Sequence, residues 1–545
     1  MKNRLREAID RGEFVVTVEM IPGRGASEES QIKEFEEMQS IYATGRVHAI
    51  SITDNPGGNP ALLADRIAGD FAHSDICSLV HFTCKDRNRN QMQAQLYALQ
   101  RKGIENLLVM SGDYQVSGFM GRARPVHDLD PVQTLMLVEG MNAGLVVEGP
   151  KGAVREAPAQ FFAGAVVNPF KYTEGEVIPQ YLKLERKILA GAQFIITQLG
   201  YDVRKMEELL QYLRSRGYTT PVIANVFLVN RGAGRLMRKG AIAGCYISDG
   251  LMAKLEAEFE TEDKGKAARI ERAAVETALA KGLGFGGVHI GGFGLTAGMI
   301  TAILDRAEEL ADDWRSLIGD LSFGDPNGFY LYEAGVDEAG NLTGLNAATV
   351  APRPERPRDR KVYKRYRLSR FFHHWVLTQQ RRFFGILAAT MERKDKKKGI
   401  NRHHGLEHVG KTLLYGCIDC GDCGLEACSY TCPMAQCPKC QRNGPCGGSN
   451  PGGWCEVYPN ERYCIHYMAY YRLKKYGELH KMSAYTTPPN NWDFSHTSGW
   501  SNYTHNRDNA AQRIPVSLGL NGQKAGTSAD PASEANNPPI TQTSH

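Results

Sequence analysis

The chain alternates short apolar runs with amphipathic stretches from residue 14 to residue 294. Each run is rich in Val, Ile, Leu and Phe, as in "FVVTVEM", and most are followed by a helical pattern such as "SEESQIKEFEEMQSIYA". Eight such runs occur, at residues 14–20, 47–54, 75–84, 105–113, 161–168, 193–200, 221–230 and 286–294. Strands and helices in this alternation predict an α/β fold, a closed parallel (β/α)8 TIM barrel. An open doubly wound sheet is the alternative, but no G-x-G-x-x-G fingerprint follows any of the runs.

Polar side chains stand at the ends of nearly all the expected strands, where such barrels place their chemistry. No serine or cysteine nucleophile has a base beside it, and no carboxylates are spaced for a metal. Taken singly, each residue is more often a cap or a hydrogen-bonding strand end, but together they indicate a site for a large polar ligand. They are Glu19, Thr53, Asp54, His81, Thr83, Asp113, Asn168, Gln198, Asn230 and His289.

Charge and turn residues divide the remainder of the chain. The barrel is expected over residues 1–315, and residues 316–410 read as a connector and basic helical bridge. Residues 353–402 hold seventeen Lys or Arg against four Asp or Glu. A nucleic-acid footprint is one interpretation of that charge. No nucleic-acid motif accompanies it, so a connector or a docking surface for an acidic partner is favoured. Residues 481–545 are polar and rich in Pro and Asn, which predicts an unpacked tail.

Ten of the thirteen cysteines fall between residues 417 and 464, which predicts a small cysteine-rich, metal-binding domain over residues 411–480. The run C-x2-C-x2-C…C-P from Cys417 to Cys432 is typical of an iron–sulfur protein. The second run, C-x2-C-x5-C-x8-C from Cys437 to Cys455, fits either a zinc site or a second cluster. Disulfides are disfavoured because the N-terminus lacks the apolar segment of a secretion signal. No run of eighteen apolar residues occurs, so a cytoplasmic chain without a membrane span is expected.

Four segments of the barrel region together resemble methylenetetrahydrofolate reductase, over roughly residues 10–310. They are "VTVEMIP", "HFTCKDRNRNQMQAQLYALQRKGIENLLVMSGD", "LKLERKILAGAQFIITQLGYD" and "PVIANVFLVNRGAGRLM". The resemblance implies a flavin, FAD or FMN, at the carboxyl-terminal face of the barrel. It also implies hydride transfer from flavin N5 to 5,10-methylenetetrahydrofolate, which gives 5-methyltetrahydrofolate.

The resemblance also implies roles for individual residues. Glu19 matches the family's general acid, and burial at an apolar strand end is expected to raise its pKa. Asp113 matches the aspartate near flavin N1 and the C2 carbonyl, and Gln198 the glutamine that contacts folate. The family usually has Arg two positions before the aspartate, where this chain has Ser111. Arg231 stands where many members stack an aromatic ring on the folate. The remaining implied flavin contacts are Thr53, His81, His127, Asp128, Ala165, Asn168 and Lys187.

The segment "CPKCQRNGPCGGSNPGGWCEVYP" resembles the C-terminal domain of some of these reductases, which in acetogens is a separate small subunit. Eight cysteines fit that pattern and allow two four-ligand centres, whereas Cys428 and Cys440 are additional. The hypothesis is that the domain holds at least one [4Fe–4S] cluster, which carries electrons between an external carrier and the flavin. One or two such clusters are expected, and zinc is possible at one of the two sites. The eight are Cys417, Cys420, Cys423, Cys432, Cys437, Cys446, Cys455 and Cys464.

The predicted function is therefore an oxidoreductase of one-carbon metabolism, a flavin-dependent methylenetetrahydrofolate reductase working in either direction. It would serve tetrahydrofolate interconversion and methionine biosynthesis. Its expected partners are tetrahydrofolates and either NAD(P)H or a carrier such as ferredoxin, with neither nucleic acid nor membrane. The sequence is compatible with a homo-oligomer. Two alternatives stay open: a flavin-free barrel methyltransferase acting on methyltetrahydrofolate, and a non-catalytic electron-transfer subunit.

Overall fold

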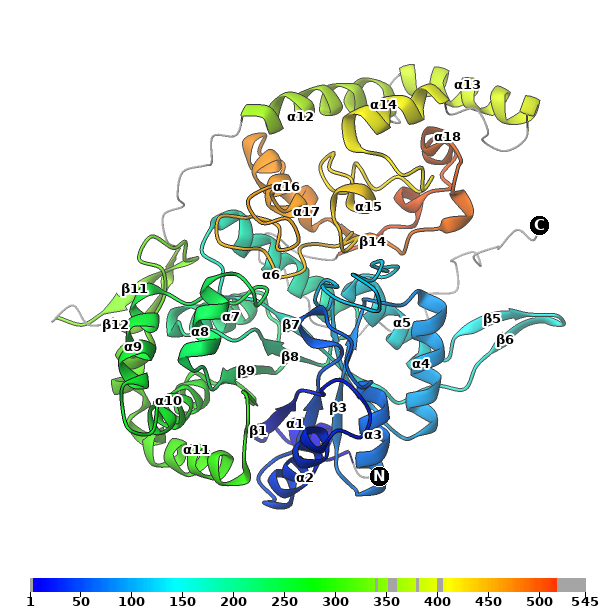
Figure 1. Cartoon of the computed structure of the whole chain (residues 1–545). Helices are drawn as coiled ribbons and strands as arrows, with labels where there is room; N and C mark the ends of the chain where they lie inside the picture. The colour runs from blue at the N-terminus through cyan, green and yellow to red at the C-terminus, as the bar shows by residue number, and fades with distance from the viewer. Residues whose placement is uncertain (1–2, 339–341, 351–359, 379–381, 399–404, 517–545) are drawn as a thin grey trace.

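The computed structural model describes residues 3–338, 342–350, 360–378, 382–398 and 405–516 (Figure 1). Eight parallel strands close into a barrel in the order β1-β10-β9-β8-β7-β4-β3-β2. Each of the eight predicted runs contains one of these strands, so the predicted (β/α)8 barrel is confirmed. The strands are β1 (Val15–Met20), β2 (Ala49–Ile52), β3 (Ser78–Thr83), β4 (Asn106–Met110), β7 (Phe162–Val167), β8 (Phe194–Thr197), β9 (Val222–Phe227) and β10 (Gly287–Gly291).

Helices cover the outside of the barrel, while the short α1 (Arg4–Asp10) contacts β1. Leu5 and Ala8 of α1 are fully buried in one cluster with inward residues of the strands, such as Leu79 and Phe194. This cluster closes the amino-terminal end, so the carboxyl-terminal end is left for chemistry. The other barrel helices are α2 (Glu29–Ala43), α3 (Ala64–His73), α4 (Arg89–Arg101), α5 (Pro131–Ala143), α6 (Glu174–Leu189), α7 (Val203–Ser215), α8 (Arg231–Arg238), α9 (Asp249–Phe259), α10 (Lys266–Leu283) and α11 (Ala297–Leu310), with the 3-10 turn η1 (Pro56–Gly58).

Two antiparallel hairpins interrupt the barrel pattern, and the sequence did not predict either. One is β5 (Val146–Gly149) with β6 (Gly152–Arg155), which projects sideways between α5 and β7 (Figure 1). The other is β11 (Tyr332–Val336) with β12 (Leu342–Val350), which follows the 3-10 segment η2 (Ala311–Leu321).

The C-terminal region lies over the barrel (Figure 1). The basic part of the connector predicted over residues 316–410 forms helices over most of its described residues. The elements are α12 (Arg360–Phe372), the π-helical η3 (His373–Leu377), α13 (Arg382–Lys398), α14 (Gly405–Tyr415), α15 (Pro433–Gln436), α16 (Ile465–Lys475), α17 (His480–Ser483), β13 (Tyr485–Thr486), η4 (Trp492–Phe494), α18 (Gly499–Thr504), η5 (Asn509–Gln512) and β14 (Ile514–Pro515).

The tail expected to be unpacked from residue 481 is instead ordered as far as residue 516. Asn490, Ser501 and Asn502 are fully buried, and the Trp492 indole donates to Asp128 on the barrel at 2.8 Å. The expectation was wrong because a polar composition does not reveal that the polar groups form hydrogen bonds with one another and with the barrel. The rest of that tail, residues 517–545, lies outside the described residues.

Buried polar contacts fix the C-terminal region to the barrel. Asp130, fully buried before α5, caps that helix and accepts the backbone N–H groups of Arg442 and Asn443 at 3.1 and 2.8 Å. Glu174, at the start of α6, accepts from Tyr470 at 2.7 Å and pairs with Lys474, both on α16. These groups lose their water on docking and regain partners across the interface, as a specific interface requires. Among the described residues, no helix is long and apolar enough to cross a membrane.

Candidate functional site

Glu19, His81 and His289 converge at the carboxyl-terminal mouth of the barrel, from β1, β3 and β10. His289 Nε2 lies 3.5 Å from Glu19 Oε2, and its Nδ1 lies 2.9 Å from Thr17 Oγ1. His81 is held in turn by Ser51 at 2.8 Å. The sequence had placed Glu19 among the strand ends, but the supporting Thr17 and Ser51 lie inside the strands and carried no signal. The arrangement gives Glu19 a neighbouring ring that can share its proton.

The structure corrects the pKa expected for Glu19. Burial does raise the pKa, as the sequence implied, but the hydrogen bond and charge of His289 are the main influences that outweigh it, so the net pKa is lowered. Burial lowers the pKa of His81 to about 4, which leaves that ring neutral at physiological pH. Glu19 is therefore ionised in the ligand-free chain, and His289 is its principal electrostatic partner.

Two of the expected flavin contacts have buried polar atoms without a protein partner in the described part of the chain. Thr53 Oγ1 and both ring nitrogens of His127 make no hydrogen bond, although both residues are 7% exposed. Burial lowers the pKa of His127 to about 3, so the ring is neutral and offers one donor and one acceptor. Asp113, which accepts the Gly57 N–H at 2.7 Å, stands close by after β4. Such unpaired groups fit a polar ligand, and a flavin meets that description.

Four other expected flavin residues are engaged by the protein itself. Asn168 Nδ2 donates to the carbonyls of Gly244 and Gly447. Lys187 Nζ donates to Val166 O, and burial together with Lys183 lowers its pKa to about 7. Asp128 binds Arg89 in bidentate fashion and also accepts from Trp492. Ala165 is fully buried within β7 and offers only backbone and a methyl group.

The two expected folate residues differ in how they are held. Gln198 follows β8, and its Oε1 accepts only the Leu199 N–H at 2.9 Å, so its amide N–H2 faces no protein acceptor within the described residues. Arg231 opens α8, and its guanidinium carbon lies 3.3 Å from the centre of the Phe259 ring, with Glu256 at 3.7 Å. In this conformation Arg231 therefore belongs to the contact between α8 and α9.

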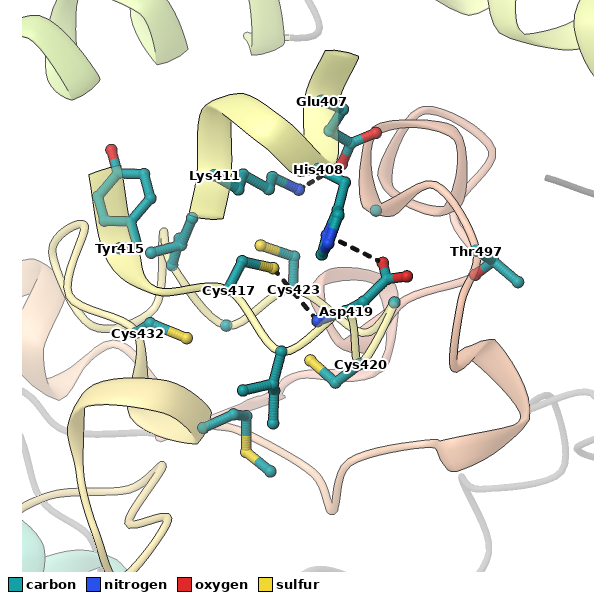
Figure 2. A pocket seen from close by; sticks show the side chains of 16 residues that line it. Glu407, His408, Lys411, Tyr415, Cys417, Asp419, Cys420, Cys423, Cys432 and Thr497 are labelled. Carbon is teal, nitrogen blue, oxygen red and sulfur yellow. Dashed lines mark hydrogen bonds and ion pairs between the residues drawn. The ribbon is translucent and has the colours of Figure 1, made fainter. Parts of the chain in front are cut away.

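The eight predicted cysteine ligands divide into two quartets, each lining its own cavity. Figure 2 shows the first quartet with Lys411 of α14 reaching over it. Cys440 lines neither of these two cavities. Cys428 lines a third cavity, which contains no cysteine of either quartet. Grouping by spacing alone had put Cys440 into the second run in place of Cys464. The first quartet is Cys417, Cys420, Cys423 and Cys432, and the second is Cys437, Cys446, Cys455 and Cys464.

The positions of the sulfur atoms bear on which metal the quartets could hold. A tetrahedral zinc site with Zn–S bonds of about 2.3 Å brings its sulfurs to about 3.8 Å from one another. Among the described residues, only Glu19, His81 and His289 form a group whose ligand atoms all lie within 4.8 Å of each other. No three described thiols of either quartet are that close together, so neither quartet is already shaped around a single zinc ion, and a set of four thiolates suits zinc as well as an iron–sulfur core.

The two quartets lie at the two ends of one short helix, and the second quartet is the one in contact with the barrel. Helix α15 separates them, with Cys432 as its N-cap and Cys437 as its C-cap, and four helical residues rise only about 6 Å. The second quartet is the one beside the barrel, because Lys439 and Gln441 of its cavity contact Gly112 and Ser111 after β4. The sequence missed this contact, although Lys439 lies within its "CPKC" motif.

Comparison with known proteins agrees with this two-part organisation. Residues 4–307 match the family model of methylenetetrahydrofolate reductase, and residues 398–493 match that of "Methylene-tetrahydrofolate reductase C terminal". A probable methylenetetrahydrofolate reductase (NADH) of Oryza sativa is 28% identical over 251 residues, 44% of this chain and 39% of that protein. Methylenetetrahydrofolate reductase (NADH) 1 of Zea mays is 28% identical over 247 residues, with the same coverage of 44% and 39%.

One solved structure is also similar, an uncharacterized protein from Clostridium thermocellum that binds two copies of 5-methyl-5,6,7,8-tetrahydrofolic acid. Its TM-score is 0.41 and its identity 15%, over 57% of this chain and 99% of that one. The chain spans about two fifths of the length of the plant relatives. The barrel model by itself covers more than half of the chain, and the chain therefore belongs to the methylenetetrahydrofolate reductase family.

Proposed function

We propose that the protein is a flavin-dependent reductase that interconverts 5,10-methylenetetrahydrofolate and 5-methyltetrahydrofolate. The observation that carries the proposal is the paired acid at the barrel mouth, Glu19 beside His289, in a chain of this family. Members of the family in general depend on a flavin. The unpaired polar atoms of Thr53 and His127 support a flavin in this barrel as well, and the structure favours neither FAD nor FMN.

The protein's own part in the reaction is to handle one proton. Opening the five-membered ring of methylenetetrahydrofolate requires protonation of the leaving nitrogen, which calls for a general acid. One proton can be held between Oε2 of Glu19 and Nε2 of His289, with Thr17 fixing the other ring nitrogen. A pterin that covers this pair excludes water and favours the neutral carboxyl, so that the proton moves to Glu19 when substrate is bound.

Gln198 and Asp113 are proposed to orient the two reactants. The amide of Gln198 can pair with the donor and acceptor edge of a pterin, and the Asp113 carboxyl group stands after β4, two strands from β8 in the barrel order. A bound flavin would supply the chemistry of hydride transfer from N5 to the methylene carbon.

The two cysteine quartets are proposed to hold iron–sulfur clusters that connect an external carrier to the flavin. Such clusters supply one-electron transfer. Burial raises the pKa of Cys420 and of Cys464 to about 12, so these thiols are protonated until a metal displaces the proton. The four cysteines around each cavity, with the two quartets at the two ends of α15, support a cluster in each.

The first quartet faces the side of the module from which a carrier could approach. Ile418, 51% exposed, lines its cavity, and Leu413, 79% exposed, lies on the adjoining helix α14. The Arg- and Lys-rich helices α12 and α13 lie on the same side (Figure 1). An apolar patch with a basic rim fits an acidic electron carrier such as a ferredoxin. We therefore propose that electrons enter here rather than from NAD(P)H at the flavin.

The test uses the full chain purified without oxygen. A flavin absorption spectrum, together with turnover of methylenetetrahydrofolate by reduced ferredoxin, is expected. Reduction by NADH or NADPH should be slower when measured side by side. A colourless protein that still transfers the methyl group of methyltetrahydrofolate would identify the methyltransferase alternative. A flavoprotein that never turns over folate would identify an electron-transfer subunit.

A further inference from the structure

The cysteine-rich module reaches into the barrel at the segment that leads to Asp113. Lys439 Nζ donates to the carbonyl of Gly112 at 2.7 Å and also pairs with Glu456. Two residues on, Gln441 accepts a hydrogen bond from Ser111 Oγ at 3.1 Å. The module thus holds both residues that precede Asp113, so the conformation of this strand end depends on it.

Lys439 is a buried cation with donor capacity left over. Its side chain is 4% exposed, and an ammonium group has three N–H donors. Gly112 and Glu456 account for two of them. A buried charged donor is costly to leave incompletely satisfied. Lys439 therefore has one N–H donor for a further acceptor, either the second oxygen of Glu456, which is buried without another partner among the described residues, or a ligand.

The surroundings indicate where that acceptor lies. The stem of Lys85 passes against Gly112, where an added Cβ would meet its carbons at 2.9 Å. The ammonium group of Lys85 already binds Asn55 O and Asp86. His127, which is close enough to sense the charges of both lysines, is buried with both ring nitrogens unpartnered among the described residues. His127 of the barrel, with its unpartnered ring nitrogens, therefore lies near Lys439 of the module.

We propose that Lys439 is a flavin-binding residue supplied by the cysteine-rich module, and that its ammonium group donates to an oxygen of the flavin beside Asp113. The inference rests on the proposed function, because it takes the ligand of the barrel to be a flavin. It also explains why this chain can have Ser111 where the resemblance leads one to expect an arginine. The positive charge of that arginine is supplied instead by Lys439 of the module. The inference also puts one positive charge between the flavin and the second quartet, since Lys439 lines that cavity.

The experiment compares Lys439→Met with a matched control, Lys411→Met, in the full chain. Lys411 is also a lysine beside a quartet, but it pairs with Glu407 of its own helix. Each protein is stripped of flavin and titrated with FMN and with FAD by fluorescence quenching, and its iron content is measured. Loss of a charge-assisted hydrogen bond should weaken flavin binding about 10- to 100-fold in Lys439→Met. Lys411→Met should bind flavin like the parent chain, and Lys439→Arg should recover most of the affinity.

Equal flavin affinity in Lys439→Met and the parent chain would overturn the inference while leaving the proposed function intact. If Lys439→Met does not fold, Lys439→Gln takes its place, because the amide keeps an N–H donor for Gly112 and lacks the positive charge. It should weaken flavin binding in the same direction, and an affinity equal to that of the parent chain would reject the contact. A parent chain that takes up neither flavin would overturn both the inference and the proposed function.

Discussion

Replacing His289 by Leu should raise the pKa of Glu19, and this change tests the electrostatic account of the site. In the parent chain two opposed influences act on the carboxyl group. Burial raises its pKa, while the hydrogen bond and charge of His289 lower it, and the second influence prevails. The leucine side chain would remove the lowering influence and keep the burial, since His289 is only 1% exposed and is replaced by a side chain of similar volume.

The size of the effect follows from the contact that is lost. A hydrogen bond to a charged group contributes about 1.5–3 kcal/mol, which corresponds to a roughly 10- to 100-fold change in an equilibrium constant. The acid dissociation constant of Glu19 should fall by that factor in His289→Leu. Thr17→Val, which only frees the far nitrogen of His289, should produce a smaller change in the same direction.

Infrared difference spectroscopy measures the change directly. The carbonyl band of protonated Glu19 is identified as the band that is missing in Glu19→Gln, and it is then titrated with pH. In the parent chain a carboxyl with lowered pKa gains its proton only in acid, whereas in His289→Leu the band should appear at higher pH. A band that titrates at the same or lower pH in His289→Leu would refute the claim that His289 controls the carboxyl group.

Two further predictions concern the metal sites. Cys464→Ser should remove the second centre and its share of the iron, whereas Cys440→Ser should keep both centres. Of these two cysteines, only Cys464 lines the cavity of the second quartet. Equal iron content in the two variants would contradict the assignment. EDTA should leave folate turnover unchanged, because we assign the group of Glu19, His81 and His289 to proton transfer. The ligand atoms of this group are close enough together to bind an ion. A loss of turnover that zinc restores would therefore identify the group as a metal site.

The sequence predicted the barrel well because the information is local. Each barrel strand is a β-branched, apolar run, and burial on both faces is what such runs specify. The polar strand ends could be found in the same way, so Glu19 and His289 were visible as candidates. Their electrostatics were not, because the sign of the Glu19 pKa shift depends on a ring 270 residues away along the chain that packs at 3.5 Å.

The cysteine-rich module shows the opposite case, in which spacing along the chain is a poor guide to spacing in space. Cys440 follows Cys437 in an apparent C-x2-C pair, yet it has a positive φ of 46° and its Sγ lies 4.0 Å from Met434 O, away from the second cavity. Cys464, nine residues after Cys455, takes the fourth place through the N-cap of α16. Contacts between domains, such as that of Lys439 with Gly112, carry no local signal at all.

Asp130 joins the two parts of the molecule, and its replacement should separate them. One carboxylate oxygen caps α5 through Val132 and Gln133, and the other accepts both Arg442 and Asn443. Asp130→Ala would remove a cap, which costs about 1 kcal/mol. It would also leave two buried N–H groups without an acceptor, at about 1–3 kcal/mol each. The combined loss is about 3–7 kcal/mol, most of it borne by the docked state.

Hydrogen exchange at the backbone amides of Arg442 and Asn443 measures the loss of stability at the two groups that lose their acceptor. Arg442 and Asn443 should exchange faster in Asp130→Ala, whereas amides within β1 of the barrel should keep their protection. Asn88→Ala is the matched control, because it removes an N-cap from α4 without a contact to the module. Asn88→Ala should therefore leave Arg442 and Asn443 protected. Unchanged exchange at these amides in Asp130→Ala would mean that the module is held by its apolar and lysine contacts alone, and that the carboxylate serves only its own helix.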